Sequence, residues 1–88
     1  VHNNMKENEF IKALIELVGR HGSTIEEIKE LFHSYSDKII TEPMDNEEFD
    51  VMIRFDDGSD PYYYCFKDEG CHIIYHRFLP EDYADFGF

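Results

Sequence analysis

The chain has 88 residues, so we treat residues 1–88 as a single small domain, and its 16% aromatic content supplies apolar mass for a core. Acidic residues outnumber basic residues by 20 to 8, which gives a formal net charge of −12. This charge disfavours nucleic acids and anionic membranes as direct ligands, because proteins bind both through Lys and Arg. The sequence contains no apolar segment long enough to span a membrane, no signal-peptide pattern and only two cysteines, so we expect a cytoplasmic protein.

Two amphipathic helices are predicted in the first part of the chain. Residues 6–19 carry apolar side chains at spacings of three and four, which is typical of one helix face, and glycines follow that can end the helix. The segment STIE (Ser23–Glu26) fits a capping box at the start of a second helix, which runs to about Tyr35. Because the break between the helices is short, residues 6–35 are predicted to form a helical hairpin after a flexible start at residues 1–5.

An antiparallel sheet is predicted over residues 48–79, where the apolar period changes from 3.6 to two. Asp57 and Gly58 fit a two-residue hairpin turn, and Gly70 fits the left-handed position of a three-residue loop. Three strands result, and residues 39–41 either form a fourth strand or fix their loop to the core. The predicted fold is therefore α+β, with two N-terminal helices packed on one face of a three- or four-stranded antiparallel meander.

These turn lengths set the register, and the register decides which side chains share a face. The two-residue turn pairs Ile53 with Tyr62, and the three-residue loop pairs Tyr64 with Ile74. The face expected to lie against the helices then holds Phe49, Val51, Ile53, Phe55, Tyr62, Tyr64, Phe66, Ile74 and Phe78. The residues predicted to be largely buried are Leu14, Val18, Ile28, Phe32, Val51, Ile53, Tyr64, Phe66 and Ile74.

The opposite face of the predicted sheet is also rich in apolar side chains. It holds Met52, Tyr63, Ile73 and Tyr75, which is more apolar surface than a solvated face normally carries. Either the acidic and aromatic tail at residues 80–88 covers part of this face, or a partner does.

No group of residues predicts a metal site, a cofactor or a reaction. His72 and His76 lie four residues apart in a strand, roughly 13 Å, which is too far for one ion. Cys65 and Cys71 are diagonal neighbours in the predicted register, which disfavours a ligand pair and a disulfide. The acids of residues 45–60 lack the ligand pattern of a calcium loop. We therefore expect no metal, no cofactor and no enzymatic activity.

The distribution of acids predicts a protein-binding surface instead. Eight acids accompany a single arginine between residues 42 and 60, and the tail PEDYADFGF alternates acids with aromatic residues. Carboxylates steer a basic partner and aromatic rings anchor it, although the acidity could serve solubility alone and the tail could fold back onto the sheet. The predicted partner-binding residues are Asp45, Glu47, Glu48, Asp50, Asp56, Asp57, Asp60, Tyr63, Tyr75, Tyr83 and Phe86.

In its size, its two helices followed by an antiparallel meander and its acidity, the chain resembles two groups of small inhibitors. One group is the bacterial toxin-immunity proteins, which cap the basic active site of a nuclease toxin. The other is the phage-type nucleic-acid mimics, including the uracil-DNA glycosylase inhibitor and acidic anti-CRISPR or anti-restriction proteins. The resemblance implies a non-enzymatic inhibitor that neutralises a basic nucleic-acid-processing protein, in the first place as an immunity protein. It transfers no individual residue role, and a small cytosolic interaction domain remains the alternative.

Overall fold

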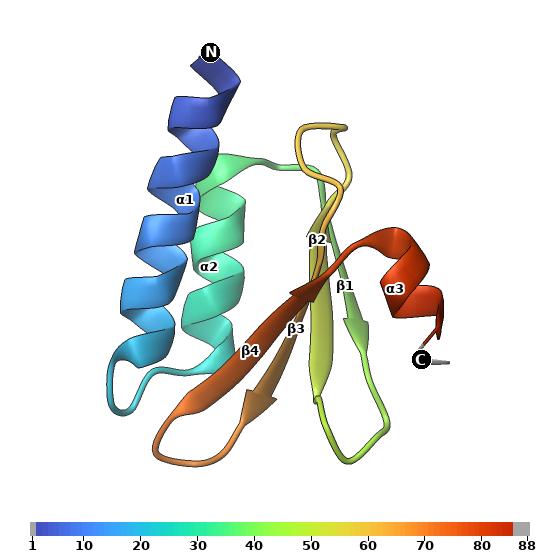
Figure 1. Cartoon of the computed structure of the whole chain (residues 1–88). Helices are drawn as coiled ribbons and strands as arrows, with labels where there is room; N and C mark the ends of the chain where they lie inside the picture. The colour runs from blue at the N-terminus through green and yellow to red at the C-terminus, as the bar shows by residue number, and fades with distance from the viewer. Residues whose placement is uncertain (1, 86–88) are drawn as a thin grey trace.

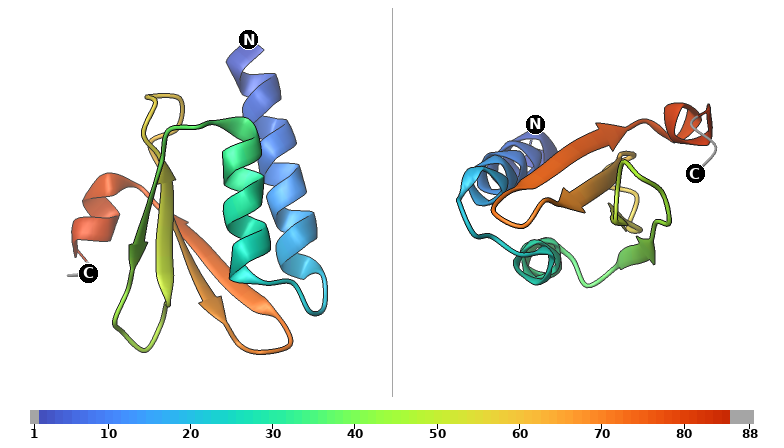
Figure 2. Two further views of the ribbon diagram at one scale, coloured as in Figure 1. Left: turned by 180° about the vertical axis from the view of Figure 1, so that it is seen from behind. Right: turned by 90° about the horizontal axis from the view of Figure 1, so that it is seen from below.

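The structure, a computed structural model, describes residues 2–85, with side chains from residue 8 onward. Its elements, in chain order, are α1 (His2–Gly19), α2 (Ile25–Tyr35), β1 (Ile39–Pro43), β2 (Val51–Phe55), β3 (Tyr63–Asp68), β4 (Ile73–Phe78) and α3 (Pro80–Asp85). The strands are antiparallel neighbours in the order β1-β2-β3-β4. Helices α1 and α2 cover one side of the sheet, and α3 lies on the other (Figures 1 and 2). The predicted α+β fold is confirmed, and residues 39–41 do belong to a fourth strand.

The helical hairpin differs from its prediction at both of its helix starts. Helix α1 begins at His2 rather than at residue 6. The capping box is formed one residue later than predicted: the Thr24 amide donates to Glu27 Oε1 (3.0 Å), and the Glu27 amide donates to Thr24 Oγ1 (3.2 Å). The Ser23 hydroxyl instead donates to the Leu17 carbonyl (2.7 Å), which satisfies an end carbonyl of α1. Ser23 therefore closes the first helix and Thr24 opens the second.

The main core lies between the helical hairpin and the sheet, and Phe32 of α2 is at its centre. The Phe32 side chain is fully buried, and its ring contacts Phe10 of α1 at 4.9 Å between centroids. On the sheet, the same ring contacts Phe55 at 5.1 Å and Tyr64 at 5.4 Å. Phe32 thus joins both helices to both central strands, β2 and β3.

The β2–β3 register differs from the predicted one by two residues, because Ile53 pairs with Tyr64 rather than with Tyr62. The predicted two-residue turn needs a positive φ at Asp57, its first central residue. Gly58 has a φ of 80°, but no non-glycine residue of the described chain has a positive φ, so Asp57 and Gly58 do not form this turn. The connection spans residues 56–62 instead. An even shift leaves each side chain on its predicted face, so the β2 and β3 core residues are assigned correctly.

The β3–β4 register differs by an odd number of residues, which reverses the faces of β4. Tyr64 pairs with Arg77 rather than with Ile74, because the loop at residues 69–72 is longer than predicted, although Gly70 has the expected positive φ. Ile73 is consequently buried (3% exposed), and Ile74 is 44% exposed. The prediction that Ile74 belongs to the core is wrong, and so is the prediction that Phe78 faces the helices. Val18, which was also predicted to be largely buried, is half-buried.

Phe49 also lies on the face opposite to its prediction. The Asp50 amide donates to the Phe66 carbonyl (2.8 Å), while Val51 is the residue that pairs with Phe66. Two successive residues therefore lie opposite one, as in a β-bulge, and the alternation of faces is interrupted there. Phe49 packs with Met52 on the side of the sheet away from α1 and α2.

Truncation of Phe32 tests the assignment of the main core. We expect Phe32→Ala to lower the free energy of unfolding by about 3–5 kcal/mol, because it opens a cavity where four elements meet. Chemical denaturation of the variant and the wild type measures the difference. A change below about 1 kcal/mol would show that α2 presents another face to the sheet.

The register of β4 is tested by a matched pair of neighbouring isoleucines. Ile73→Ala is expected to cost about 2–5 kcal/mol of unfolding free energy, because the side chain is buried in the main core. Ile74→Ala is expected to change it by less than about 0.5 kcal/mol, because the side chain is exposed. Denaturation curves of both variants decide the matter, and the reverse order of costs would restore the predicted register.

Candidate functional site

The sheet face away from α1 and α2 carries a second apolar cluster. Its buried members are Phe49, Met52, Cys65 and Phe78. Three half-buried side chains pack against them: Met44, Tyr63 and Tyr83. These three come from the β1–β2 loop, from β3 and from α3, so chain segments distant in sequence meet on this face. We call the seven residues together the second cluster.

Two of the predicted aromatic anchors are brought into contact in the second cluster. The rings of Tyr63 and Tyr83 lie 4.6 Å apart between centroids, and Tyr83 also contacts Phe78 at 6.4 Å. The Arg54 guanidinium lies over the other ring, 5.2 Å from the centroid of Tyr63. Burial raises the pKa of Tyr83, and the nearby Cys65 and Glu42 raise it further. Both rings are therefore held in place by contacts within the chain.

Helix α3 is the element that places Tyr83 on the sheet. Pro80 occupies its first position, where the missing amide hydrogen costs nothing, and Glu81 and Asp82 in the first turn interact favourably with the helix dipole. The Tyr83 amide donates to the Leu79 carbonyl (2.9 Å). The tail thus folds back onto the sheet through Tyr83, while Phe86, another predicted anchor, lies outside the described residues.

The loop at residues 44–50 presents three of the predicted acids beside the second cluster. The Met44 amide donates to the Asp50 carbonyl (2.8 Å), and Asn46 Oδ1 accepts from the amides of Glu48 (2.9 Å) and Phe49 (2.8 Å). The carboxylates of Asp45, Glu47 and Glu48 are exposed and have no hydrogen-bond or ion-pair partner among residues 8–85. The loop is therefore ordered by its backbone and by Asn46, which leaves these three charges unneutralised.

Asp50, at the end of the same loop, is engaged within the chain. Its carboxylate accepts from the Asp68 amide (2.8 Å) and lies 3.6 Å from Lys67 Nζ. These contacts connect the β1–β2 loop to the end of β3. Asp50 therefore serves the fold, and its charge is partly balanced by Lys67.

The remaining predicted acids lie at the opposite end of β2, in the β2–β3 loop (Figure 1). Asp56 lies 3.3 Å from Arg54 Nη1, and the Asp57 carboxylate accepts from the Ser59 hydroxyl and amide, which lowers its pKa to about 2. Asp60 accepts from the Tyr62 amide and from the Tyr64 hydroxyl, both at 2.7 Å. The five residues of β2 extend over roughly 17 Å, so the acids form two groups rather than one edge.

Tyr75 is not part of the second cluster. It lies on the helix-covered face, where its ring stacks on Phe66 with centroids 5.9 Å apart and planes at 22°. The odd register shift of β4 is the reason, since it exchanges the faces of Tyr75 and Phe78. The sequence-based grouping of Tyr75 with Tyr63 is therefore wrong.

The cysteines and histidines form no cluster suited to chemistry within the described chain. Among the side chains that the structure describes, from residue 8 to residue 85, no group of three or more His, Cys, Asp or Glu could hold a metal ion. Burial raises the pKa of the Cys65 thiol to about 12, so this thiol stays protonated, whereas Cys71 is exposed on the β3–β4 loop. None of the described helices combines the length and apolar composition needed to cross a bilayer.

Sequence reasoning missed Met44 and Glu42 at this site. Residues 40, 42 and 44 follow the period of two that a strand imposes, and Glu42 pairs with Met52 of the second cluster in the β1–β2 ladder. An extension of the predicted fourth strand beyond residue 41 would have placed both side chains on this face. The signal was present, but the neighbouring proline and acids indicated a loop.

Comparison with known proteins gives a family match over almost the whole chain. Residues 1–87 match the model described as "Domain of unknown function, E. rectale Gene description (DUF3877)". No curated protein and no solved structure matches the chain. The family description names no ligand, partner or reaction, so the function must be argued from the geometry of the site.

The covering role of Tyr83 can be measured through Cys65. In a Cys71→Ser background, Cys65 is the single thiol. We expect Tyr83→Ala to increase the rate at which Cys65 is alkylated at least about tenfold, because the second cluster then opens locally more easily. Tyr75→Ala, which removes a half-buried tyrosine from the other face, is the control. Denaturation curves of both variants separate local opening from global unfolding. Equal alkylation rates at equal stability would show that α3 does not protect this cluster.

Proposed function

The chain belongs to the DUF3877 family, and we propose that it is a non-enzymatic binding protein that holds a basic protein partner on its second cluster. The observation that carries the proposal is the packed pair of Tyr63 and Tyr83 beside three acids that have no hydrogen-bond or ion-pair partner within residues 8–85. The partner class that fits best is a nucleic-acid-processing protein, and the biological role that fits best is that of a toxin-immunity protein.

The tyrosine pair supports a role as an anchor. Tyrosine is enriched at protein interfaces because it buries a large apolar ring and keeps a hydroxyl for hydrogen bonding. Tyr63 is restrained by Tyr83 on one side and by Arg54 above it, so binding would cost little additional side-chain entropy. A preorganised ring pair of this kind favours slow dissociation.

The unneutralised acids support a basic partner. Asp45, Glu47 and Glu48 are exposed, and they would break no hydrogen bond or ion pair within residues 8–85 to meet a Lys or Arg. Glu81 and Asp82, in the first turn of the helix that carries Tyr83, add further negative charge. With a net charge of −12, the chain attracts a basic protein over several ångströms and so accelerates encounter.

A nucleic-acid-processing partner is supported because the acidic surface could replace the phosphates that such a protein binds. Enzymes of this class gather Lys and Arg around the groove that binds phosphates. Carboxylates set at intervals around an aromatic centre can occupy the phosphate positions and block the groove. The resemblance in size, element order and acidity to toxin-immunity proteins favours a nuclease toxin as the partner, with phage-type mimicry and solubility alone as the alternatives.

Two double charge reversals with the same change in net charge test this proposal. Glu47→Lys/Glu48→Lys alters the loop beside the second cluster, and Glu9→Lys/Glu30→Lys alters exposed positions on α1 and α2. We expect the loop variant to lose at least about tenfold in association rate at low salt, and the helix variant much less, because steering depends on the local field. Capture from a lysate of the source organism, mass spectrometry and rate measurements at low and high salt provide the comparison.

The outcomes separate the partner classes. Capture of a nuclease whose activity is blocked by this chain supports the immunity role, whereas capture of a restriction or CRISPR enzyme supports phage-type mimicry. Equal loss of rate in both double variants would contradict docking on the second cluster. Failure to retain any basic protein would leave solubility as the explanation of the acidity.

A further inference from the structure

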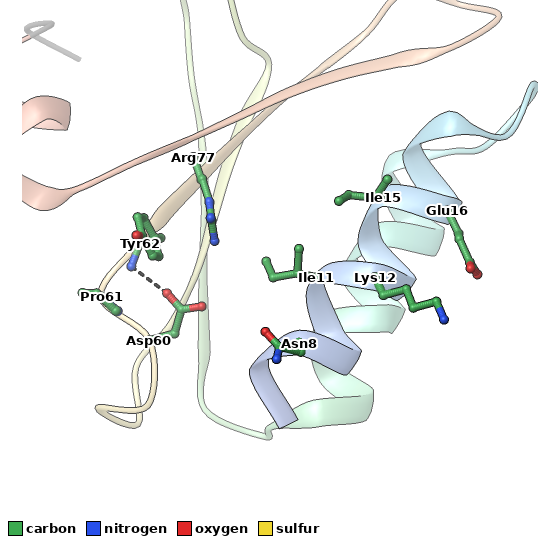
Figure 3. Close-up of a pocket in the computed structure, with 9 residues that line it drawn as sticks. All are labelled: Asn8, Ile11, Lys12, Ile15, Glu16, Asp60, Pro61, Tyr62 and Arg77. Carbon is green, nitrogen blue, oxygen red and sulfur yellow. Dashed lines mark hydrogen bonds between the residues drawn. The ribbon is translucent and has the colours of Figure 1, made fainter. Parts of the chain in front are cut away.

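A groove of about 650 Å³ lies on the side of the molecule that carries α1 (Figure 3). One wall is formed by α1, and the other by the β2–β3 loop and the end of β4. The lining includes Ile11, Lys12, Ile15, Asp60, Tyr62 and Arg77. A volume of this size is within the range of sites that bind small organic molecules.

The groove has an apolar wall that the fold leaves uncovered. Ile11 and Ile15 lie one turn apart on α1, and both side chains are directed toward the groove (Figure 3). Ile15 is 54% exposed, the largest exposed fraction of any large apolar side chain from residue 8 to residue 85. Across the groove, the half-buried ring of Tyr62 offers a second apolar surface. An apolar body of several carbon atoms could therefore replace water between α1 and Tyr62.

Arg77 supplies a cation inside the groove. Its side chain extends from β4 into the space between Tyr62 and α1 (Figure 3), and its guanidinium carbon lies 4.3 Å from the centroid of the Tyr62 ring. The Tyr64 oxygen also lies beside it. Stacking on a ring restricts the guanidinium to one plane, which favours planar, two-point recognition of a carboxylate.

Arg77 has no ion-pair partner among the side chains of residues 8–85. Asp60 is the acid on the same side of the groove, but its two oxygens accept from the Tyr62 amide and the Tyr64 hydroxyl. Arg54 and Lys67, by contrast, are each paired with an aspartate. Other cations within residues 8–85, such as Arg20 and Lys38, also have no ion pair, but Arg77 lies beside an apolar wall and over an aromatic ring, where it can meet an anion supplied from outside.

We propose that this groove binds a small monocarboxylate with an apolar body. The carboxylate would accept two N–H bonds from Arg77, with Lys12 at the rim, and the apolar body would lie against Ile11, Ile15 and Tyr62. A single negative charge is specified because Glu16 and Asp60 also line the groove, and because the net charge of −12 repels polyanions. The groove lies on the opposite side of the sheet from the second cluster, so the two proposals can fail independently.

Octanoate is the probe, because it joins one carboxylate to a short apolar chain. Calorimetry with the intact protein should show octanoate binding, and octanol, which lacks the charge, and acetate, which lacks the chain, should each bind at least about tenfold more weakly. In ¹H–¹³C spectra, the largest shifts should fall on the methyl groups of Ile11 and Ile15. Dissociation constants above about 10 mM for octanoate would contradict the proposal.

The chain offers matched control variants for both halves of the site. Arg77→Gln should weaken octanoate binding at least about tenfold, since it removes a charge-assisted hydrogen-bond pair. Arg54→Gln should leave it unchanged, because Arg54 also lies over a tyrosine ring but on the other face. Ile15→Ser should weaken binding, and Ile74→Ser, which alters another exposed isoleucine, should not.

Each remaining result is decisive. Equal losses in Arg77→Gln and Arg54→Gln, or equal binding of octanoate and octanol, would overturn the proposal. If Arg77→Gln does not fold, the wild-type spectra decide: shifts confined to the groove support the site, and shifts on Tyr63 and Tyr83 contradict it. Dimerisation without octanoate, with the Ile15 methyl groups shifted in the dimer, would assign the groove to a second copy of the chain and would also overturn the proposal.

Discussion

The hydrogen bond from Tyr64 to Asp60 is the contact that ties the β2–β3 loop, and with it one wall of the groove, to the core. The Tyr64 ring is fully buried against Phe10 and Phe32, and a buried hydroxyl needs a partner, which Asp60 provides at 2.7 Å. Burial raises the pKa of Tyr64, and Asp60 raises it further, so the phenol remains a donor throughout the physiological range. This bond holds the β2–β3 loop against the core and gives the Asp60 carboxylate a structural role.

The sheet separates the groove, which contains a cation, from the second cluster, which is bordered by acids. On the helix side, the aromatic core continues outward through Tyr62 to a groove in which Arg77 has no acidic partner among residues 8–85. On the other side, the second cluster is small, α3 and the β1–β2 loop pack against it, and acids border it. Strand alternation makes the separation possible, because neighbouring residues such as Tyr62 and Tyr63 contribute to different surfaces.

Much of this arrangement was predictable from periodicity and turn residues. The two helices, the fold class and the faces of β2 and β3 follow from the change of period and from the glycine-containing turns, and the even register error did no harm. The face of β4 was not predictable, because a small difference in the length of the β3–β4 loop reverses it. The bulge at Asp50 could not be foreseen either, since it arises from two residues sharing Phe66, and it is what brings Phe49 to Phe78.

The hardest feature to infer from the sequence was which acids remain available to a partner, and side-chain length helps to explain why. Among the predicted partner-binding acids, those with a hydrogen-bond or ion-pair partner within residues 8–85 are the aspartates at positions 50, 56, 57 and 60. An aspartate carboxylate lies close enough to its own backbone to accept amides one or two residues ahead, as Asp57 and Asp60 do, so turn formation occupies it. Glu47 and Glu48 carry an additional methylene and take no such part in their loop, which Asn46 shapes instead. In an acidic loop-rich chain, glutamates beside an asparagine turn are therefore better candidates for meeting a partner than aspartates that build the turns themselves.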